Sequence, residues 1–386
     1  MRIAIFSDNF YPELSGISDS IITLAKELSR RHRIHFYVPY YSKANYKFVN
    51  ALPKEIDLGK NIEITRFFSL PVKTGTKQGR MVIPNGFRWI KVKKFNPDII
   101  HTQLFFGVGL EALWTAHRLK VPLIGTNHTA IKEFLRYFPL RTVFIDNLIT
   151  KYVNWYYSKC ALVTAPSKIV LEEMEKNGLV ANTKTISNPI DTVTFQPLLK
   201  KSVEYDLISA GRLAPERKTK IIIKALPLVK KKFPNVKLAL AGRGIEEKEL
   251  KQLIHKLNLD NNVVFLGFVN QSVLNQAYNS SKIFVIASTS ETQSLVTMQA
   301  MAAGLPVIGV RAMALPEYLS NNHGILVDPD NSDLLAEKII YLLANREIRE
   351  KMGQEACRFA QNFSISKITE IWENIYLTAI NSYKDH

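Results

Sequence analysis

The 386-residue chain contains little cysteine and no long hydrophobic run. Its two cysteines, Cys160 and Cys357, are too few for a disulfide framework and lack the spacing of metal ligands, which favours a reducing compartment. The apolar run near the start ends at Asp8 and is too short for a signal peptide. No uninterrupted run approaches the roughly 20 apolar residues of a membrane-spanning helix. We therefore expect a cytoplasmic protein, either free or peripheral on the cytosolic face of a membrane.

Acidic residues are absent between Glu63 and Asp98, in a chain whose net charge is +17. This window contains aromatic residues among its cations, and the candidate contact residues are Arg66, Lys73, Lys77, Arg80, Arg88, Trp89, Lys91, Lys93 and Lys94. Basic residues beside aromatics are typical of a peripheral contact with an anionic membrane. They would also suit nucleic-acid phosphates, but no nucleic-acid-binding motif accompanies them. We expect a membrane contact and no nucleic acid; a merely solvated basic face is the alternative.

Apolar strand patterns alternate with helical patterns along the whole chain, which predicts doubly wound parallel sheets. The alternation stops in the turn-rich segment from Asn188 to Pro197 and then starts again, as expected for a linker between two domains. An amphipathic segment from Ile365 to Ser382 follows the second domain. We expect domains at residues 1–190 and 191–363, with residues 364–386 forming a final helix. Between Phe134 and Tyr157 the pattern predicts an aromatic helix.

A ligand-binding pattern follows the predicted strand that ends near Ser288. Glu291 lies after the strand, Ser294 is a candidate N-cap, and Leu295 begins a short helix that Gly304 and Pro306 terminate. In open parallel sheets, ligands bind at the carboxyl ends of the strands, and helix N-termini attract phosphates. The pattern therefore predicts a phosphate-bearing ligand beside Glu291.

Glu291 and the polar Gln299 eight residues later resemble the paired-glutamate signature of retaining glycosyltransferases of family 4, which have the two-domain GT-B fold. Gln299 stands where the family usually has a second Glu, and Ser294 where it usually has Gly. The resemblance implies two Rossmann-like domains facing a deep cleft, the second of which binds a nucleotide sugar. It also implies that Glu291 addresses the transferred sugar and Gln299 the ribose, and that the final helix crosses back to the first domain.

Further motifs match the family in order. The segment Gly211 to Lys218 resembles the one whose Arg and Lys hold the donor diphosphate, which implies this role for Arg212 and for Arg217 or Lys218. His128, in Gly125-Thr-Asn-His-Thr129, matches a histidine that faces the donor sugar, and Gly16 matches a glycine loop lining the cleft. The implied catalytic residues are Glu291, His128 and Arg212, and the implied donor-binding residues are Gly16, Arg212, Arg217, Lys218, Ser294, Leu295 and Gln299.

One further pattern, Asp328-Pro-Asp330, formally matches a metal-binding motif. Its position before a predicted helix favours a turn and an N-cap instead. The resemblance likewise implies that no metal or other cofactor is needed.

The region from Leu70 to Pro84, with the basic aromatic helix after it, is similar to that of the diacylglycerol glucosyltransferases and phosphatidylinositol mannosyltransferases. We therefore expect hexose transfer from a nucleoside-diphosphate sugar, with UDP-glucose favoured, to a lipid at the membrane, with diacylglycerol as first choice. A soluble or polysaccharide acceptor is the second hypothesis. A catalytically silent donor-binding subunit is the third, because of Gln299 and Ser294.

Overall fold

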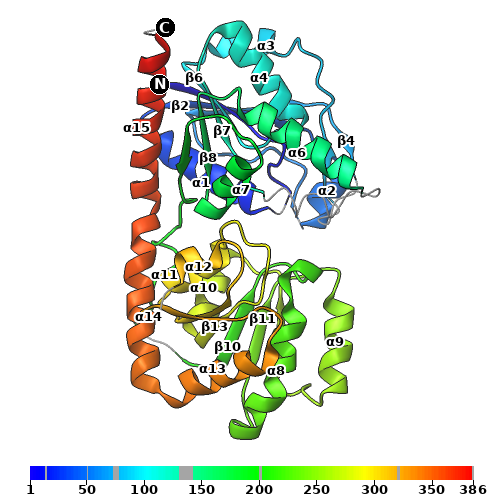
Figure 1. Ribbon diagram of the computed structural model, residues 1–386, viewed down its shortest axis with the longest axis vertical. Coiled ribbons are helices and arrows are strands. Elements are labelled where there is room, and N and C mark those ends of the chain that lie inside the picture. The colour runs from blue at the N-terminus through cyan, green and yellow to red at the C-terminus, as the bar shows by residue number, and fades with distance from the viewer. Residues whose placement is uncertain are drawn as a thin grey trace. The chain divides into compact units, whose positions relative to one another are not determined.

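The computed structural model describes residues 1–13, 15–49, 51–72, 78–129, 142–199, 202–319 and 322–384. The chain divides into two compact units (Figure 1). Unit 1 comprises Met1–Pro189 together with Ile365–His386, and unit 2 comprises Ile190–Ser364. Each unit is an α/β structure with its own parallel sheet.

The first strand of the chain lies near the centre of the sheet of unit 1, and later strands pair on both sides of it. In spatial order its strands are β3 (Ile62–Phe67), β2 (Arg33–Pro39), β1 (Arg2–Phe6), β6 (Ile99–Thr102), β7 (Leu123–Thr126), β8 (Leu162–Ala165) and β9 (Thr183–Thr185). All neighbours pair in parallel. The central strands are buried almost throughout, because helices cover both faces of the sheet.

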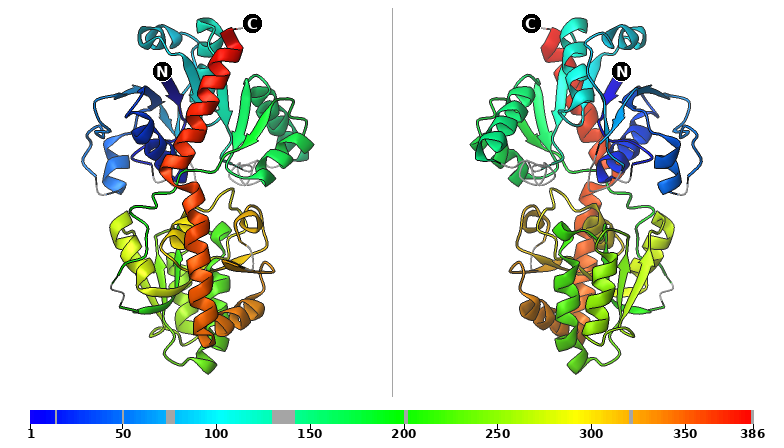
Figure 2. Two further views of the ribbon diagram at one scale, coloured as in Figure 1. Left: turned by 90° about the vertical axis from the view of Figure 1, so that its left-hand side faces the viewer. Right: turned by 90° about the vertical axis from the view of Figure 1, so that its right-hand side faces the viewer.

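The helices of unit 1 form a layer on each face of this sheet. They are α1 (Gly16–Leu28), α2 (Lys43–Phe48), α3 (Trp89–Phe95), α4 (Gly107–Leu119), α6 (Val143–Tyr157), α7 (Lys168–Lys176) and α15 (Ile365–Lys384). α15 packs on α1 and β6, whereas α4 packs on the sheet from the opposite face (Figures 1 and 2). A short antiparallel hairpin, β4 (Leu70–Pro71) and β5 (Arg80–Met81), precedes α3. Of the helix expected from Phe134 to Tyr157, the described part is α6, and residues 134–141 lie outside the described ranges.

The sheet of unit 2 is built in the same way, with its first strand near the centre and later strands on both sides. Its strands in spatial order are β12 (Val263–Gly267), β11 (Leu238–Ala241), β10 (Tyr205–Ala210), β13 (Ser281–Val285), β14 (Val307–Val310) and β15 (Gly324–Val327). Its helices are α8 (Thr219–Lys232), α9 (Glu247–Lys256), α10 (Gln271–Asn279), α11 (Leu295–Ala302), α12 (Leu315–Tyr318), α13 (Ser332–Ala344) and α14 (Arg346–Ala360), with short 3-10 turns at Pro215–Arg217 and Gln361–Phe363. α8 packs against α13, and α11 packs against α14.

In each unit the direction of strand addition reverses next to the first strand. The reversal lies between β1 and β6 in unit 1 and between β10 and β13 in unit 2. The loops that leave the carboxyl ends of these two strands diverge to opposite faces, which leaves a crevice where ligands bind in sheets of this kind. The candidate sites are therefore the two carboxyl edges.

Candidate functional site

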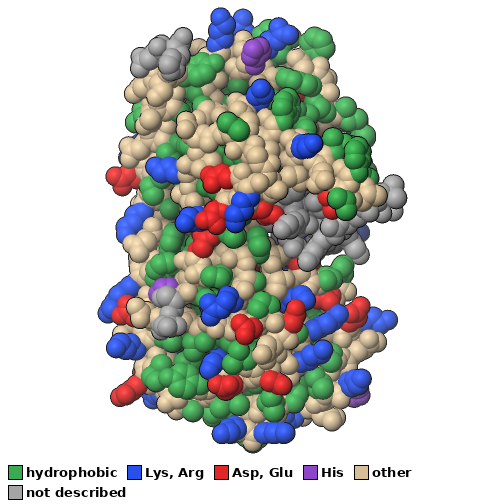
Figure 3. Space-filling model, viewed as in Figure 1, with side chains coloured by type: hydrophobic (Ala, Val, Ile, Leu, Met, Phe, Trp, Pro, Cys, Tyr) green, Lys and Arg blue, Asp and Glu red, His purple; other side chains and the backbone are tan. Residues whose placement is uncertain are grey.

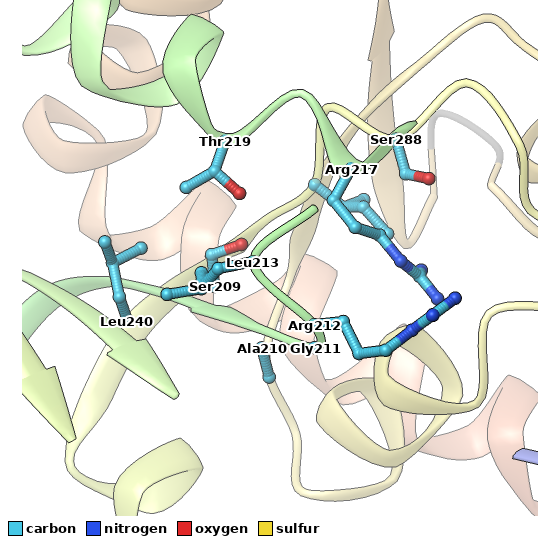
Figure 4. A pocket seen from close by; sticks show the side chains of 10 residues that line it. Ser209, Ala210, Gly211, Arg212, Leu213, Arg217, Thr219, Leu240 and Ser288 are labelled. Atoms are coloured by element: carbon cyan, nitrogen blue, oxygen red, sulfur yellow. The ribbon is translucent and has the colours of Figure 1, made fainter. Parts of the chain in front are cut away.

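In unit 2, the loops after β10 and β13 bring two arginines and a carboxylate together. A small pocket at this edge is lined by Gly211, Arg212 and Arg217 from the β10 side and by Ser288 from the β13 side. The guanidinium groups of Arg212 and Arg217 converge beside it (Figure 4). Two converging guanidinium groups form a site for an anion with several oxygens, such as a diphosphate.

Each of these arginines has a carboxylate partner. Arg217 forms an ion pair with Glu291, whose side chain is buried. Nη2 of Arg212 lies 3.4 Å from Oε1 of Glu216, four residues later in the chain. The backbone of Glu216 accepts a hydrogen bond from the amide of Thr289, 3.4 Å away, which links the β10 and β13 loops. The site therefore balances its positive charge internally.

Lys218, the other candidate for the diphosphate, is engaged elsewhere. Its ammonium group donates to both carboxylate oxygens of Asp330, at 3.0 and 3.2 Å. Both residues have left-handed backbone, with φ of 54° at Lys218 and 60° at Asp330. The ion pair thus joins the start of α8 to the turn before α13.

The turn expected at Asp328-Pro-Asp330 is present, but the expected cap is not formed by these aspartates. Asn331 caps α13, and its side-chain oxygen accepts from the amide of Leu334 at 2.9 Å. Asp330 cannot take this position because its backbone is left-handed and its carboxylate faces Lys218. Within the described residues, no three His, Cys, Asp or Glu side chains are grouped as metal ligands.

The segment that follows Glu291 forms the helix expected from the sequence. Ser294 is the N-cap residue of α11, and Leu295 is its first residue. The buried Ser294 hydroxyl accepts from the hydroxyl of Thr297 at 2.8 Å instead of capping the backbone. Gln299 lies half-buried on the second turn of α11. The amides at the start of α11 thus lie on the same loop as Glu291.

Two glycines that the motifs did not single out shape this edge. Gly242 and Gly244 follow β11, and a Cβ at either would overlap a backbone carbonyl, that of Gly211 or that of Leu213. The Leu213 amide also donates to the carbonyl of Arg243 at 3.0 Å. The β10 and β11 loops therefore interlock through close backbone contact. The Gly-x-Gly pattern directly after a predicted strand was the available signal.

In unit 1, His128 lies at the carboxyl edge, beyond the end of β7. Its Nε2 donates to the side-chain oxygen of Gln103, which follows β6, at 2.8 Å. Burial lowers the pKa of His128 to about 4, so the imidazole is neutral at pH 7. His128 can therefore hold a hydroxyl group by hydrogen bonding but carries no charge.

The first strand contributes a second buried polar group that the motifs did not predict. The carboxylate of Asp8, after β1, accepts from the amides of Val108 and Gly109 at 2.8 and 3.3 Å. Burial raises the pKa of Asp8 to about 6, although the backbone hydrogen bonds oppose this shift. Gly16 begins α1, where the Ser15 hydroxyl accepts from the amide of Ile17 at 3.2 Å.

The basic window divides into internal and exposed residues, which corrects two expected membrane contacts. Arg66 is mostly buried and donates to the carboxylate of Glu55 and to the carbonyl of Tyr11. Arg88 is likewise mostly buried against Glu111, whose side chain is fully buried. Both guanidinium groups are used inside unit 1, because each satisfies oxygen atoms that would otherwise lack donors.

The remaining residues of the window differ in exposure. Lys91, Lys93 and Lys94 are exposed on α3, whereas Trp89 is half-buried. Arg80 is half-buried and donates to the Tyr40 carbonyl at 3.1 Å. Lys73 and Lys77 lie outside the described residues. Large exposed apolar side chains accompany these lysines, namely Phe68, Leu70, Met81, Ile83, Phe87 and Ile90. No helix in the described ranges is both long enough and apolar enough to cross a membrane.

Two family models together match most of the chain. The model "Glycosyltransferase Family 4" matches residues 14–194, and the model "Glycosyl transferases group 1" matches residues 191–359. The chain belongs to glycosyltransferase family 4. This family 4 enzyme is therefore a hexosyltransferase that uses a nucleotide sugar.

Individual relatives and a solved structure are also similar to this family 4 chain. An alpha-monoglucosyldiacylglycerol synthase of Streptococcus pneumoniae is 28% identical, with 80% of this chain and 70% of that protein covered. One of Acholeplasma laidlawii is 24% identical, with 99% and 98% covered. The structure of Anabaena HepE in complex with UDP-glucose superposes with a TM-score of 0.75 over 98% of this chain and 100% of that one, at 19% identity. The last similarity concerns the fold, and it confirms the predicted GT-B class.

Proposed function

We propose that this glycosyltransferase moves glucose from UDP-glucose to diacylglycerol at a membrane surface, with retention of the anomeric configuration. The observation that carries the proposal is the convergence of Arg212, Arg217 and Glu291 at the strand reversal of unit 2. The choice of glucose and diacylglycerol draws on the names of the two synthases similar to the whole chain or most of it. UDP is the nucleotide in the HepE complex.

In this proposal unit 2 binds the donor. Arg212 and Arg217 hold the diphosphate, together with the amides at the start of α11. The side-chain amide of Gln299, on the next turn of α11, accepts a hydrogen bond from one ribose hydroxyl and donates one to another. Ser294 and Leu295 line the phosphate side. Lys218, paired with Asp330, contributes to the shape of the loop and not to phosphate binding.

The chemical step needs little from protein acids or bases. The bond between the sugar C1 and the diphosphate oxygen breaks, and a bond from the acceptor oxygen to C1 forms on the same face. The acceptor proton passes to the departing diphosphate oxygen, and the two arginines stabilise the charge that develops there. In unit 2, Glu291 orients the sugar hydroxyls. In unit 1, we assign the neutral His128 to a hydrogen bond with a hydroxyl group, as the family resemblance implies. No step requires a metal.

Unit 1 takes the acceptor and rests on the membrane. The surface that we assign to this contact comprises the exposed lysines Lys91, Lys93 and Lys94 with the exposed Phe87 and Ile90. Each exposed lysine near an anionic lipid surface contributes about 1 kcal/mol to binding. The apolar side chains enter the headgroup region, where a diacylglycerol hydroxyl lies.

The test is a reaction of the purified protein with UDP-glucose, UDP-galactose or GDP-mannose and diacylglycerol in detergent micelles, with products identified by mass spectrometry. We expect a monohexosyl diacylglycerol from UDP-glucose alone. Parallel reactions contain a soluble polysaccharide in place of diacylglycerol, and a product formed only in these would replace the lipid acceptor by a soluble one. Donor binding without transfer to any acceptor would identify a silent donor-binding subunit.

A further inference from the structure

The outward face of α6 carries a row of apolar side chains that the sequence motifs did not identify. Phe144, Leu148 and Trp155 are exposed by 76%, 58% and 48%, and they follow one another at helical spacing. We name these three residues the α6 stripe. The opposite side of the same helix buries Val153 and Tyr156 in the core of unit 1. The core of unit 1 therefore does not bury the three side chains of the α6 stripe.

α6 belongs to a continuous layer of helices. The Tyr156 hydroxyl donates to the carbonyl of Gly109 in α4 at 2.9 Å, and α4 packs in turn against α3. Figure 3 shows hydrophobic side chains with basic ones among them on the part of unit 1 where Figure 1 places α6. The stripe and the lysines of α3 thus lie on one layer of the unit.

The exposed charged side chains of the layer formed by α3, α4 and α6 are basic. Its two acids are Glu111, which is fully buried, and Asp146, which is half-buried on α6. Its exposed cations are Lys91, Lys93, Lys94, Arg118 and Lys151. Lys151 lies on the same face of α6 as the stripe. A surface of this composition complements an anionic one.

We propose that the α6 stripe enters the headgroup region of an anionic bilayer, as a second membrane contact beside that of α3. Phenylalanine, leucine and tryptophan with lysine between them are the composition of a helix that lies in a membrane interface. A second copy of the chain fits poorly, because a twofold contact through this layer would place like charges opposite one another. This inference rests on the proposed function, since it assigns the membrane contact of an enzyme with a lipid acceptor.

The experiment compares co-sedimentation of the full chain with vesicles of phosphatidylcholine, with and without phosphatidylglycerol. The test variant carries Phe144→Glu and Leu148→Glu. The control carries the same change at exposed apolar residues of unit 1 outside the layer, Val180→Glu and Leu377→Glu. We expect the test variant to bind phosphatidylglycerol vesicles roughly tenfold more weakly than wild type, and the control variant to bind within about twofold of it.

Equal binding by the test variant and wild type would overturn the inference. So would equal loss in both variants, which would indicate a general charge effect. Sedimentation velocity without lipid adds a third outcome. If the wild type is a dimer and the test variant is a monomer, the stripe serves self-association and the inference is overturned. Transfer to diacylglycerol in detergent micelles is measured in parallel and tests the proposed function alone, since micelles remove the need for vesicle binding. Unchanged melting temperatures check that both variants fold.

Discussion

Arg217 and Glu291 pair with each other at the edge where we place the donor diphosphate and sugar. The pair joins the 3-10 turn after β10 to the loop before α11, and the Glu291 side chain is almost completely buried. A donor that binds both residues must therefore break the ion pair between them and form a new contact with each. Without the donor, the pair keeps a buried carboxylate from being left without a counter-charge.

The first prediction concerns this pair. Glu291→Gln should lower turnover by a factor on the order of 100 because it removes the group that orients the sugar, while donor affinity is kept because Arg217 is released to the phosphate. Arg217→Ala should weaken donor affinity and lower turnover as well. Calorimetry with the donor and single-turnover rates separate the two effects. Equal losses of affinity in both variants would argue against this division of roles.

The second prediction separates Lys218 from the arginines. Lys218→Gly should leave turnover within about threefold of wild type, because the ammonium group is held by Asp330. It should also leave the melting temperature nearly unchanged: relief of the left-handed backbone is worth about 1 kcal/mol, and a half-exposed ion pair contributes about the same or less. Arg212→Ala, the matched comparison, should lower turnover on the order of 100-fold. A similar loss in the glycine variant would return Lys218 to the phosphate site.

The third prediction tests the substituted family residue. Gln299→Ala should weaken donor binding by about 1 to 2 kcal/mol, the scale of a lost hydrogen bond. Gln299→Glu should preserve or strengthen binding, because a carboxylate accepts hydrogen bonds from a ribose diol more strongly. Donor affinities measured by calorimetry decide the matter. If neither substitution changes them, Gln299 has no contact with the ribose.

The fourth prediction compares an internal arginine with the surface lysines. Arg88→Ala should destabilise unit 1 by about 3 to 5 kcal/mol, because it leaves the fully buried Glu111 without its cation. Replacing Lys91, Lys93 and Lys94 by Gln should leave the melting temperature unchanged but weaken binding to anionic vesicles. Denaturant unfolding and vesicle sedimentation are measured for both variants. Weaker vesicle binding by a stably folded Arg88→Ala protein would restore Arg88 to the membrane surface.

The fifth prediction concerns pH. Burial lowers the pKa of His101 to about 3, helped by the nearby His128, and that of His128 to about 4. The unfolded chain therefore takes up protons first as the pH falls below about 6.5, and the folded state loses stability from there down to about pH 3. Buried Asp8 acts in the opposite sense below about pH 6, because its raised pKa means that the folded state takes up that proton first.

The two histidine shifts together exceed that of Asp8, so the net result is lower stability at acidic pH. Unfolding free energies measured between pH 7.5 and about 5 should fall in wild type. His128→Gln should show a shallower decline, by up to about 1.4 kcal/mol per pH unit. A decline of the same slope in this variant would show that His128 is not held neutral by burial.

The alternation of strands and helices was predictable because buried parallel strands read as continuous apolar runs. The edge strand β3 gives a weaker signal, because its residues from Ile62 to Phe67 mix apolar with polar side chains and are mostly only half-buried. The helix at Leu295 was predicted from Ser294 and Gly304, and it lies where expected because its stop signals are local. Local patterns were therefore sufficient where a segment's own residues decide its structure.

Partners far apart in the chain were not predictable. A run of cations without acids gives no sign that Arg66 turns toward Glu55 and that Arg88 turns toward Glu111. The contact of Gly242 and Gly244 with the β10 loop likewise depends on neighbouring strands that the sheet brings together. The α6 stripe was hidden because an apolar helix face has the same pattern whether it is buried or exposed.

The most direct test of the account is the anomeric configuration and identity of the product. Wild-type protein, UDP-glucose and diacylglycerol in micelles should give an α-glucosyl diacylglycerol, identified by proton NMR of the anomeric signal, and Glu291→Gln should form it on the order of 100-fold more slowly. A β-linked product, or no lipid product from any nucleotide sugar, would contradict the account.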